Sequence, residues 1–556
     1  MERRKRGGRR LSVGTTLGVA LATAAAVAAT VVSAATSNTT ASGTEVAPAK
    51  ISSVVPVSSA HKVSTVYSLE VNGKSIPVNG YAGYDYAQFS MTSGPATVVV
   101  TKLNGTQVGK ALISPVKQGY KAKLKAGTAT FTMRGSEYLI IKLDGQRRLV
   151  LSADPAETDR PASSGTGVFN VTQSPYSADP SGRAVSTAGV QKAIDAASAY
   201  GSVAGHSRGI VYIPRGLYPV GNLEIKSNTA VYLEAGAVLR VVADKSLYRV
   251  DAYKDSQKRD LTWWIRTSFG SRNIKMYGRG TLDGNGMAAT KAGFGMNVLV
   301  PVATSDFTLD GLTIREGASW SVIPTRSDNA SFTNMKVFNR FDMGENDAFD
   351  AIESQHVSVR RGIGISLDDS YSTKTWPKQV GITKNWPGEP EKISDVTFDG
   401  LLAWTYCFGY KVGQGMVGDH DRVTFKNSVV YDAAVGIGIH HKAGAGTARN
   451  ITFSNIDIEQ LTFKLERRQT WIVFLVEDAY KNGAGPVTGV RISHVNVRAK
   501  GSTPGVLAGF SDSSSISGAV FDSIRMPGTT AYAKTLKDMN ITDVRFAAEP
   551  GIMATP

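Results

Sequence analysis

Short runs that alternate apolar and polar residues fill most of the chain, and helical periodicity is rare. Between residues 63 and 153 lie four of these runs: VYSLEVNG, ATVVVTKLNG, TATFTMRG and YLIIKLDGQRRLVL. Several contain Asn-Gly or Asp-Gly, the strongest short signal for a β-hairpin, because these residues accept the positive φ of a tight turn. The pattern predicts a small antiparallel β-sandwich over residues 61–154. A linker rich in Pro, Ser and Gly follows over 155–167.

A second pattern covers residues 168–556. After one short amphipathic helix at 186–200, β-type runs recur, each followed by a polar or Gly break and another apolar run. Phe398, Phe425, Phe453 and Ile492 hold equivalent places, at spacings of 27, 28 and 39 residues. A recurring unit of about 20–50 residues that cannot bury its own apolar face implies a stacked solenoid. Because no crossover helices separate the strands, we predict an all-β chain whose main part is a right-handed parallel β-helix. The helix would cover its N-terminal edge.

The first 35 residues have the three parts of a secretory signal peptide. A basic segment (MERRKRGGRR) precedes an uncharged run from Leu11 to Val32, and small residues follow. Arg9-Arg10 is compatible with a twin-arginine signal. The alternative is an N-terminal membrane anchor, but the run is rich in Ala and Thr rather than Leu. We therefore expect residues 1–35 to be removed, 36–60 to form a linker, and the secreted protein to have no stable membrane span.

Composition and charge narrow the class of protein further. A hydrophobic fraction of 42% with 19% charged residues is typical of a globular chain. The single cysteine among 556 residues excludes a disulfide framework and a cysteine-based zinc cluster. The formal net charge is +16, but no run resembles a nucleic-acid-binding module, so we expect no nucleic-acid partner.

The sharpest chemical feature is a concentration of acidic residues at 345–350 and 367–370. Asp347 and Asp368 are 21 residues apart, about one coil of the solenoid. Parallel stacking places equivalent positions ~4.8 Å apart, so Asp347 would lie against Asp368-Asp369. Three carboxylates this close cannot all be ionised cheaply, and one protonated beside one ionised carboxylate is what glycoside hydrolysis requires. The structural alternative is that Asp and Asn simply bond to the backbone at solenoid turns.

Four stretches match motifs of a known group of proteins. Residues 278–286 (GRGTLDGNG) are similar to a G-x-G-T-[IL]-D-G-x-G coil, and 320–324 (WSVIP) to W-x-[IV]-x-P. Residues 345–350 (ENDAFD) are similar to N-T-D-G-I-D, and Asp368-Asp369 to a pair of aspartates. Through them the segment 168–546 resembles the polygalacturonase clan of parallel β-helix glycosidases, which includes glycoside hydrolase families 28, 49 and 87.

The resemblance implies a pectate-lyase-like solenoid and an inverting mechanism. Asp347, Asp368 and Asp369 would be the catalytic carboxylates. Asp368 takes the place of the family's general acid, and Asp347 and Asp369 would activate water. Carboxyl groups only ~5 Å apart would by the general rule indicate a retaining enzyme. We follow the resemblance, because a third carboxylate beside the pair can help to hold a water.

Two departures from family 28 bear on the substrate. The histidine of its G-H-G motif is Phe408 here, and its R-I-K motif falls at Gly438-Ile439-His440. A uronate needs a fixed cation, best supplied by a bidentate arginine. The sequence therefore favours a neutral α-glucan of the dextran or α-1,3-glucan type, as cut by families 49 and 87. A sandwich ahead of the β-helix also resembles family 49. A polygalacturonase-like pectin hydrolase stays open, since Lys411 or Lys442 could supply a cation.

The candidate substrate-binding residues are of three kinds. His440 falls at the place of a family binding residue, and Asp350 is the second aspartate of the altered motif. Lys411 and Lys442 are the candidate cations. Aromatic side chains can stack on sugar rings, and from these we select Trp320, Trp376 and Trp471; we place the last two in insertions, where binding loops belong.

Other classes of function are not excluded at this stage. A calcium-dependent polysaccharide lyase would need a Lys or Arg base beside a carboxylate-bound cation. A non-catalytic glycan-binding β-helix would bind without turnover. No histidine spacing of a metal site stands out. We expect a monomeric enzyme with a polysaccharide substrate, no metal and no cofactor.

Overall fold

The computed structural model describes residues 47–378 and 380–554. The expected signal peptide and the first part of the expected linker lie outside the described residues. Within them, no helix is long and apolar enough to cross a membrane. The helical segments are α1 (Thr187–Gly201), α2 (Gly286–Lys291) and the 3₁₀ turns η1 (Val116–Gln118), η2 (Lys245–Leu247) and η3 (Gly381–Thr383).

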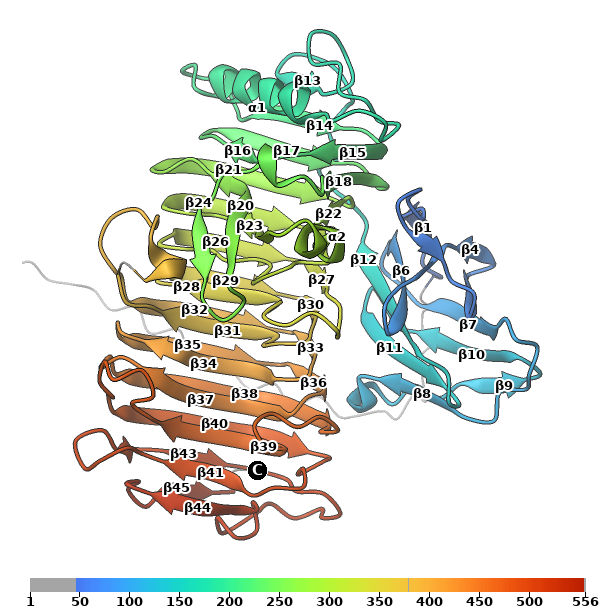
Figure 1. Cartoon of the computed structure of the whole chain (residues 1–556). Helices are drawn as coiled ribbons and strands as arrows, with labels where there is room; N and C mark the ends of the chain where they lie inside the picture. The colour runs from blue at the N-terminus through green and yellow to red at the C-terminus, as the bar shows by residue number, and fades with distance from the viewer. Residues whose placement is uncertain (1–46, 379, 555–556) are drawn as a thin grey trace, which may run out of the picture. The chain divides into compact units, whose positions relative to one another are not determined.

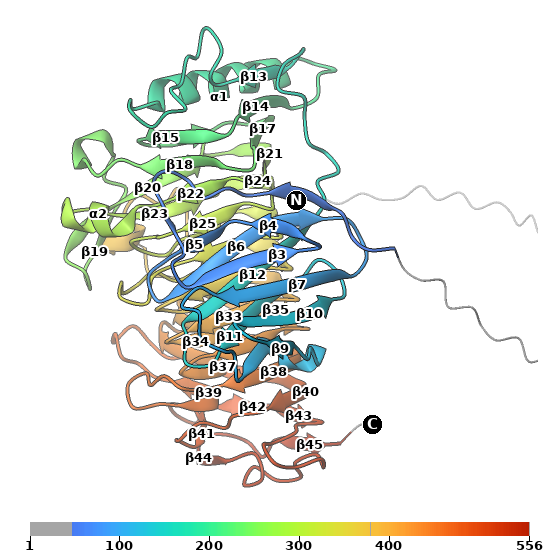
Figure 2. The same ribbon diagram turned by 90° about the vertical axis from the view of Figure 1, so that its right-hand side faces the viewer.

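The N-terminal part is built from two sheets. Figure 2 shows the strands of the smaller sheet side by side. Hairpins join neighbouring strands where the sequence has Asn72-Gly73 and Asp144-Gly145, and Asn72 and Asp144 have positive φ. The larger sheet contains β1 (Ile51–Val54), β2 (Lys62–Val63), β5 (Val78–Gly80), β6 (Tyr84–Met91), β8 (Ala111–Ser114), β11 (Tyr138–Leu143) and β12 (Arg148–Pro155). The smaller sheet contains β3 (Tyr67–Val71), β4 (Lys74–Ile76), β7 (Ala96–Lys102), β9 (Lys123–Lys125) and β10 (Thr128–Met133).

One segment differs from the sequence-based prediction. Strand β1 lies inside residues 36–60, which we interpreted as a linker, and it pairs antiparallel with β6. The segment is rich in Ser and has only a short apolar run, so its own pattern is weak. Its place in the sheet comes from backbone hydrogen bonds to an edge of β6 that local sequence does not reveal.

The remaining strands form a parallel β-helix, as predicted. The longest sheet contains β13 (Val168–Asn170), β14 (Gly209–Ile213), β15 (Gly216–Val220), β17 (Thr229–Leu233), β18 (Ala237–Val241), β21 (Ser271–Gly278), β22 (Thr281–Asp283), β24 (Thr304–Asp310), β25 (Thr313–Arg315), β26 (Asp328–Thr333), β27 (Lys336–Phe338), β29 (Gln355–Arg360), β30 (Ile363–Ser366), β32 (Ile393–Asp399), β33 (Leu402–Thr405), β35 (His420–Lys426), β36 (Val429–Asp432), β38 (Ala448–Gln460), β40 (Val487–Val497), β42 (Ile516–Ser517), β43 (Val520–Asp522) and β45 (Gly551–Met553). A second face contains β28 (Phe349–Ile352), β31 (Tyr371–Thr375), β34 (Phe408–Met416), β37 (Val435–Ala443), β39 (Thr470–Val476), β41 (Gly505–Ala508) and β44 (Ile541–Arg545). A short sheet of the early coils contains β16 (Leu223–Ile225), β19 (Ala252–Lys254), β20 (Arg259–Thr267) and β23 (Gly295–Val300).

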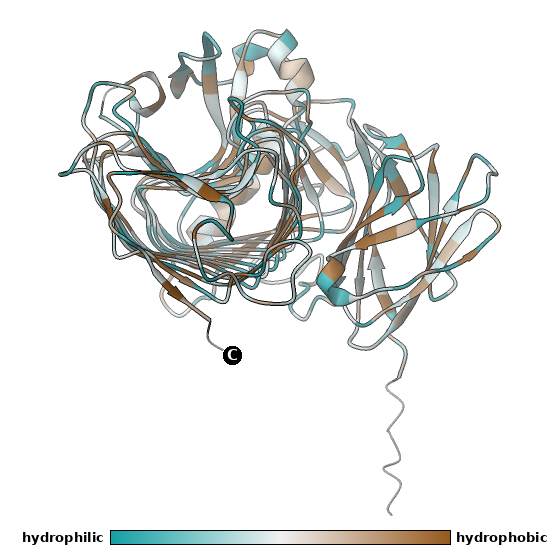
Figure 3. Cartoon of the chain, turned by 90° about the horizontal axis from the view of Figure 1, so that it is seen from below, coloured by the Kyte–Doolittle hydropathy of each residue, from teal (hydrophilic) through white to brown (hydrophobic). Residues whose placement is uncertain are grey.

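Each central coil contributes three strands, and each strand pairs in parallel with its counterpart one coil later. Thus β32, β33 and β34 pair with β35, β36 and β37. Figure 3 views these coils from below and shows them superposed around a common interior. Side chains at equivalent positions therefore stack along the solenoid.

The four equivalent positions identified in the sequence stack in this interior. Phe398 is the register partner of Phe425, Phe425 of Phe453, and Phe453 of Ile492. The ring centroids of the first pair are 4.6 Å apart with planes 4° apart, and those of the second pair are 5.2 Å and 5° apart. All four side chains are buried. The repeat in the sequence is thus the coil period of the solenoid.

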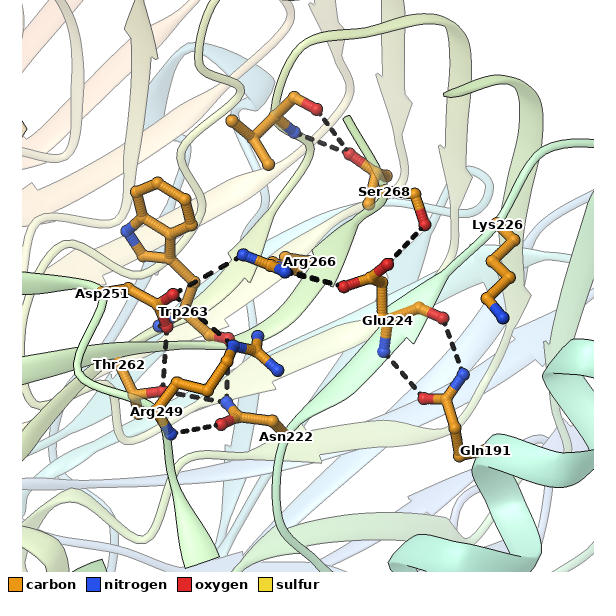
Figure 4. Close-up of polar contacts among 12 residues, drawn as sticks. Gln191, Asn222, Glu224, Lys226, Arg249, Asp251, Thr262, Trp263, Arg266 and Ser268 are labelled. Atoms are coloured by element: carbon orange, nitrogen blue, oxygen red, sulfur yellow. Dashed lines mark hydrogen bonds and ion pairs between the residues drawn. The ribbon is translucent and has the colours of Figure 1, made fainter. Parts of the chain in front are cut away.

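Helix α1 covers the N-terminal end of the stack, as Figure 1 shows. Its apolar face, which includes Val190 and Ile194, is buried in the solenoid core. Gln191 accepts a hydrogen bond from the backbone N–H of Glu224 (2.9 Å) and donates one to its carbonyl (3.0 Å). The carboxylate of Glu224 in turn accepts from Arg266 and Ser268, as drawn in Figure 4. The helix therefore satisfies the exposed edge of β16 and closes the end of the sheet.

The sandwich and the solenoid share a buried apolar cluster. Tyr86 packs on Phe338 with ring centroids 4.7 Å apart, and Tyr84 donates a hydrogen bond to the carbonyl oxygen of Asn339. A buried ion pair lies beside this cluster, in which Lys336 donates to Asp154 at 2.6 Å. The two parts are joined by packing as well as by the chain.

Candidate active site

A polar pocket of about 210 Å³ opens over the second face of the solenoid, where β28, β31, β34 and β37 lie side by side. Its lining is dominated by charged side chains. The lining residues are Trp320, Glu345, Asp347, Asp368, Asp369, Lys374, Cys407, Lys411, Gln414, His440, Lys442, Leu465 and Glu466. All three aspartates expected to be catalytic are among them.

Strand register explains how the aspartates meet. Strands β28 and β31 pair in parallel with Asp350 opposite Ser372, an offset of 22 residues. The backbone N–H of Ala348 donates to the carbonyl of Asp369 at 2.9 Å. The register therefore places Asp369, rather than Asp368, opposite Asp347, one residue away from the 21-residue spacing that we used. Asp368 lies beside this pair, and its Oδ1 accepts the backbone N–H of Asp369 at 2.9 Å.

Two buried lysines hold two of the three aspartates. Lys374 donates to Asp347, lies 2.9 Å from Asp350 and lies 4.0 Å from the nearer oxygen of Asp369. Lys411 donates to Asp369 at 2.8 Å. Among the described side chains, no lysine or arginine lies within ion-pair distance of Asp368. The cluster therefore gives its three carboxylates different partners.

These partners separate the proton affinities of the carboxylates. Desolvation in the pocket and the neighbouring Asp369 raise the pKa of Asp368. Burial by itself would raise the pKa of Asp369 too, but Lys411 and Lys374 lower it below its usual range. Burial raises the pKa of Asp347 well above its usual range, against the attraction of Lys374. Asp369 is thus the carboxylate that ionises most easily, and Asp347 and Asp368 hold a proton more tightly than an ordinary aspartate, which is the arrangement of paired acid and base groups.

Lys374 was not predicted from the sequence. It is 2% exposed, and its ammonium group lies 4.3 Å from the ring centroid of Trp320. It lies in the strand-forming run YSTKT, which begins two residues after Asp369. Its position in the sequence does not single it out, because a lysine in a β-run is ordinarily solvent-exposed.

The candidate binding residues divide into those that line the pocket and those that do not. Lys411, Lys442 and His440 line it. Burial lowers the pKa of His440, whose Nε2 lies 3.1 Å from Glu477. Asp350 lies beneath the pocket floor, fully buried, where it accepts from Ser372.

The three selected tryptophans differ in position. Trp376 is partly exposed and follows β31 directly. Trp320 lines the pocket but is only 3% exposed, with Lys254 and Lys374 both over its ring at 4.2 and 4.3 Å. For Trp471 the prediction of substrate binding was wrong. It is fully buried in β39 and donates its indole N–H to the carbonyl of Met539, so it cannot stack on a bound sugar.

One trio of side chains has the spacing of a metal site. One potential ligand atom from each of Asp368, Asp369 and Cys407 lies within 4.8 Å of the others. The chemistry of the donor set fits poorly. Carboxylate oxygens suit hard ions such as calcium, whereas a thiolate suits soft ones, and burial raises the pKa of the Cys407 thiol well above its usual range. Lys411 already occupies an oxygen of Asp369. We derive no chemistry through a metal here.

The fold and this site define a parallel β-helix protein with a buried carboxylate cluster on one of its sheets. No family model matches the chain. A curated relative, an exopolygalacturonase of Cochliobolus carbonum, is 19% identical over 290 residues, which is 47% of this chain. The match spans 61% of the length of that relative.

Solved structures with a similar fold cover more of the chain. Dex49A from Penicillium minioluteum aligns with a TM-score of 0.51 and 13% identity, covering 90% of this chain and 96% of that one. The family 28 exopolygalacturonase of Yersinia enterocolitica aligns with a TM-score of 0.50 and 13% identity, covering 83% and 97%. The exopolygalacturonase of Thermotoga maritima aligns with a TM-score of 0.52 and 14% identity, covering 65% and 92%. These likenesses establish the parallel β-helix fold.

Proposed function

We propose that the protein is a secreted, inverting glycoside hydrolase that cleaves a neutral α-glucan of the dextran or α-1,3-glucan type. The carboxylate cluster supports hydrolysis, and the charge of the pocket supports a neutral substrate. The leader sequence supports secretion. The chain's likeness to glycoside hydrolases of the polygalacturonase clan supports the reaction class.

In the proposed reaction, Asp368 donates its proton to the glycosidic oxygen as the bond from that oxygen to the anomeric carbon breaks. A water on the opposite face of the sugar forms the new bond to that carbon. One of its protons passes to the ionised carboxylate of Asp369, with Asp347 beside it to help hold the water, and proton exchange with solvent restores Asp368 and Asp369. Asp368 suits the acid role because its pKa is raised and none of the described lysines or arginines lies within ion-pair distance of it. Asp369 suits the base role because two lysines keep it ionised.

The observation that carries the substrate class is the charge balance of the pocket. Five carboxylates and three lysines line it. Each of these lysines has a protein carboxylate as partner: Lys374 with Asp347, Lys411 with Asp369, and Lys442 with Glu466 at 3.6 Å. A uronate carboxylate would therefore find no free cation to pair with among the described lining residues. A neutral sugar needs no such partner.

The likeness to Dex49A also favours a neutral glucan, because the sequence resembles family 49 in having a sandwich ahead of the β-helix. Residues 168–556 make up about 70% of the chain. An alignment over 90% of the chain must therefore extend well ahead of residue 168, whereas the 65% coverage by the Thermotoga structure does not require this. A pectin hydrolase is the second candidate, favoured by the exopolygalacturonases among the similar proteins.

Reducing-sugar release from dextran, α-1,3-glucan, pullulan and polygalacturonate tests the proposal. We expect release from a neutral glucan by the wild type. We expect Asp368→Asn to lower the rate roughly 10²–10⁴-fold, the usual contribution of a general acid. Asp543→Asn, which changes a half-buried carboxylate of β44 outside the pocket, is the matched control. Release from polygalacturonate alone would replace the neutral substrate by a uronate. NMR of the newly formed anomer tests inversion, and a product of retained configuration would contradict it.

A further inference from the structure

A second cavity of about 350 Å³ adjoins the catalytic pocket. We call it the aromatic pocket. Three segments distant in the sequence build it: residues 253–256 at β19, the insertion after β31, and the loop after β39. Its lining includes Lys254, Ser256, Trp320, Trp376, Tyr480 and Asn482.

Trp320 connects the two cavities, because it lines both of them. The ring of Trp376 stacks on it, with centroids 6.2 Å apart and planes 20° apart. Tyr480 meets Trp376 edge-on at 6.3 Å and 87°. Three aromatic side chains thus lead from the edge of the catalytic pocket to the outer rim of the aromatic pocket, where Tyr480 is 54% exposed.

The lining chemistry fits a neutral sugar ring. Only Lys254 and Asp255 are charged, and the ammonium of Lys254 lies 2.7 Å from Glu345 of the catalytic pocket. The aromatic and aliphatic residues offer surfaces for the C–H face of a pyranose, and Ser256 and Asn482 offer hydrogen-bonding groups for hydroxyls. An apolar cavity with a few placed polar groups is the usual form of a small-molecule site.

The volume of the catalytic pocket also indicates that a polysaccharide binds beyond it. Binding cavities for small ligands usually measure about 300–1,000 Å³. The catalytic pocket is smaller, at about 210 Å³, so it holds only a short part of a polysaccharide. The aromatic pocket lies within that range and begins at the same tryptophan.

We propose that the aromatic pocket is a second glycan-binding subsite, which binds the neutral pyranose unit adjoining the one in the catalytic pocket. The proposal rests on the proposed function. Trp376 and Tyr480 stack on the ring of this unit and set the preference for oligosaccharides over the shortest substrates. Trp376 and Tyr480 lie in connections that follow the stacked strands β31 and β39, so the specificity of the subsite is separable from the carboxylate chemistry.

The first test compares substrates of different length. We would measure kcat/KM for α-linked gluco-oligosaccharides of two to six units with the wild type, Tyr480→Ala and Tyr480→Phe. In the wild type kcat/KM rises with length. We expect Tyr480→Ala to reduce the ratio of long to short substrates roughly tenfold, about the loss of one stacking contact, and Tyr480→Phe to preserve it. An unchanged ratio in Tyr480→Ala would overturn the proposal.

A second measurement separates the subsite from the reaction. The Asp368→Asn variant would be titrated with the same oligosaccharides, following tryptophan fluorescence. Saturable quenching that weakens in Asp368→Asn/Tyr480→Ala would support the subsite, even if the wild type cleaved no glucan and the proposed function failed. Absence of binding by every oligosaccharide, or equal binding by both variants, would overturn it.

Discussion

Two buried lysines set Asp368 and Asp369 apart in their affinity for a proton. Lys411 contacts Asp369, and Lys374 bridges Asp347 and Asp350, so Asp368 is left without an ammonium partner. An activity that needs Asp368 protonated and Asp369 ionised has a pH optimum, and it falls at lower and at higher pH. The acidic limb follows the lowered pKa of Asp369, and the basic limb follows the raised pKa of Asp368.

The pH dependence of kcat/KM provides the first prediction at this scale. Removing the ammonium group in Lys411→Met removes the attraction that lowers the pKa of Asp369. The pKa of Asp369 then rises, so the acidic limb moves to higher pH while the basic limb moves less. Lys442→Met is the comparison, because Lys442 pairs with the exposed Glu466 at 3.6 Å and is not in ion-pair contact with Asp369. An acidic limb that stayed in place in Lys411→Met would remove Asp369 from the base role.

At the scale of single residues, the sequence predicts which aspartates form the cluster, but it does not predict which buried lysines pair with them. The spacing of Asp347, Asp368 and Asp369 is visible because the coil period converts sequence distance into stacking. Lys374 has no such signal, because its burial depends on tertiary neighbours such as Trp320. The prediction that Trp471 binds substrate was wrong for the same reason. The sequence around an aromatic residue after a long connection does not distinguish a residue that faces a cleft from one that is buried in the core.

At the scale of elements, the stacked phenylalanines carry much of the cohesion between coils. Phe425 is fully buried between Phe398 and Phe453. We predict that Phe425→Ala lowers the free energy of unfolding by about 3–5 kcal/mol, because it leaves a cavity in a ladder that cannot collapse easily. In Phe425→Leu the new side chain fills most of that volume, so we expect a smaller loss of the free energy of unfolding. Urea unfolding followed by far-UV circular dichroism would measure both, and equal losses would argue against the cavity explanation.

A histidine at the start of β35 gives the strand stack a sensitivity to acid. His420 is fully buried, and burial lowers its pKa to about 3. Because an unfolded histidine titrates near 6.5, the unfolded state binds more protons between these values, so stability falls as the pH drops from about 6.5 toward 3. This group contributes about 1.4 kcal/mol per pH unit in that window. We predict a shallower decline for His420→Leu, with the exposed His356→Gln as control; parallel declines would contradict this account.

The prediction of secondary-structure elements was confirmed where a pattern repeats over several coils, and it was wrong where a single short strand pairs with a distant one. The ladder through Phe398, Phe425 and Phe453 repeats over successive coils, so the coil architecture follows from it. Strand β1 has only four residues, and its partner β6 is about 35 residues further along the chain. Such non-local pairing leaves little trace in a single short segment.

At the scale of the whole molecule, a buried ion pair joins the two folded parts. Asp154 of β12 accepts from Lys336 at 2.6 Å and lies 3.5 Å from Arg279. We predict that Asp154→Ala destabilises the protein by about 3–5 kcal/mol, because two buried cations lose their carboxylate. Asp154→Ala/Lys336→Met should recover part of the loss. Thermal unfolding by calorimetry would compare the two variants, and a double variant less stable than the single one would contradict the explanation.

The shared apolar cluster also bears on how this protein can be divided for study. On the solenoid it consists of large apolar side chains from β27, β30, β33 and β36, which the tyrosines of β6 help to bury. Its solenoid members are Phe338, Ile363, Ile365, Leu402, Trp404, Val429 and Tyr431. Expressed without the sandwich, the solenoid would present this surface to water, the kind of patch that drives aggregation. The sandwich thus keeps the solenoid soluble from within the same chain, and a solenoid produced alone would first need those side chains replaced with polar ones.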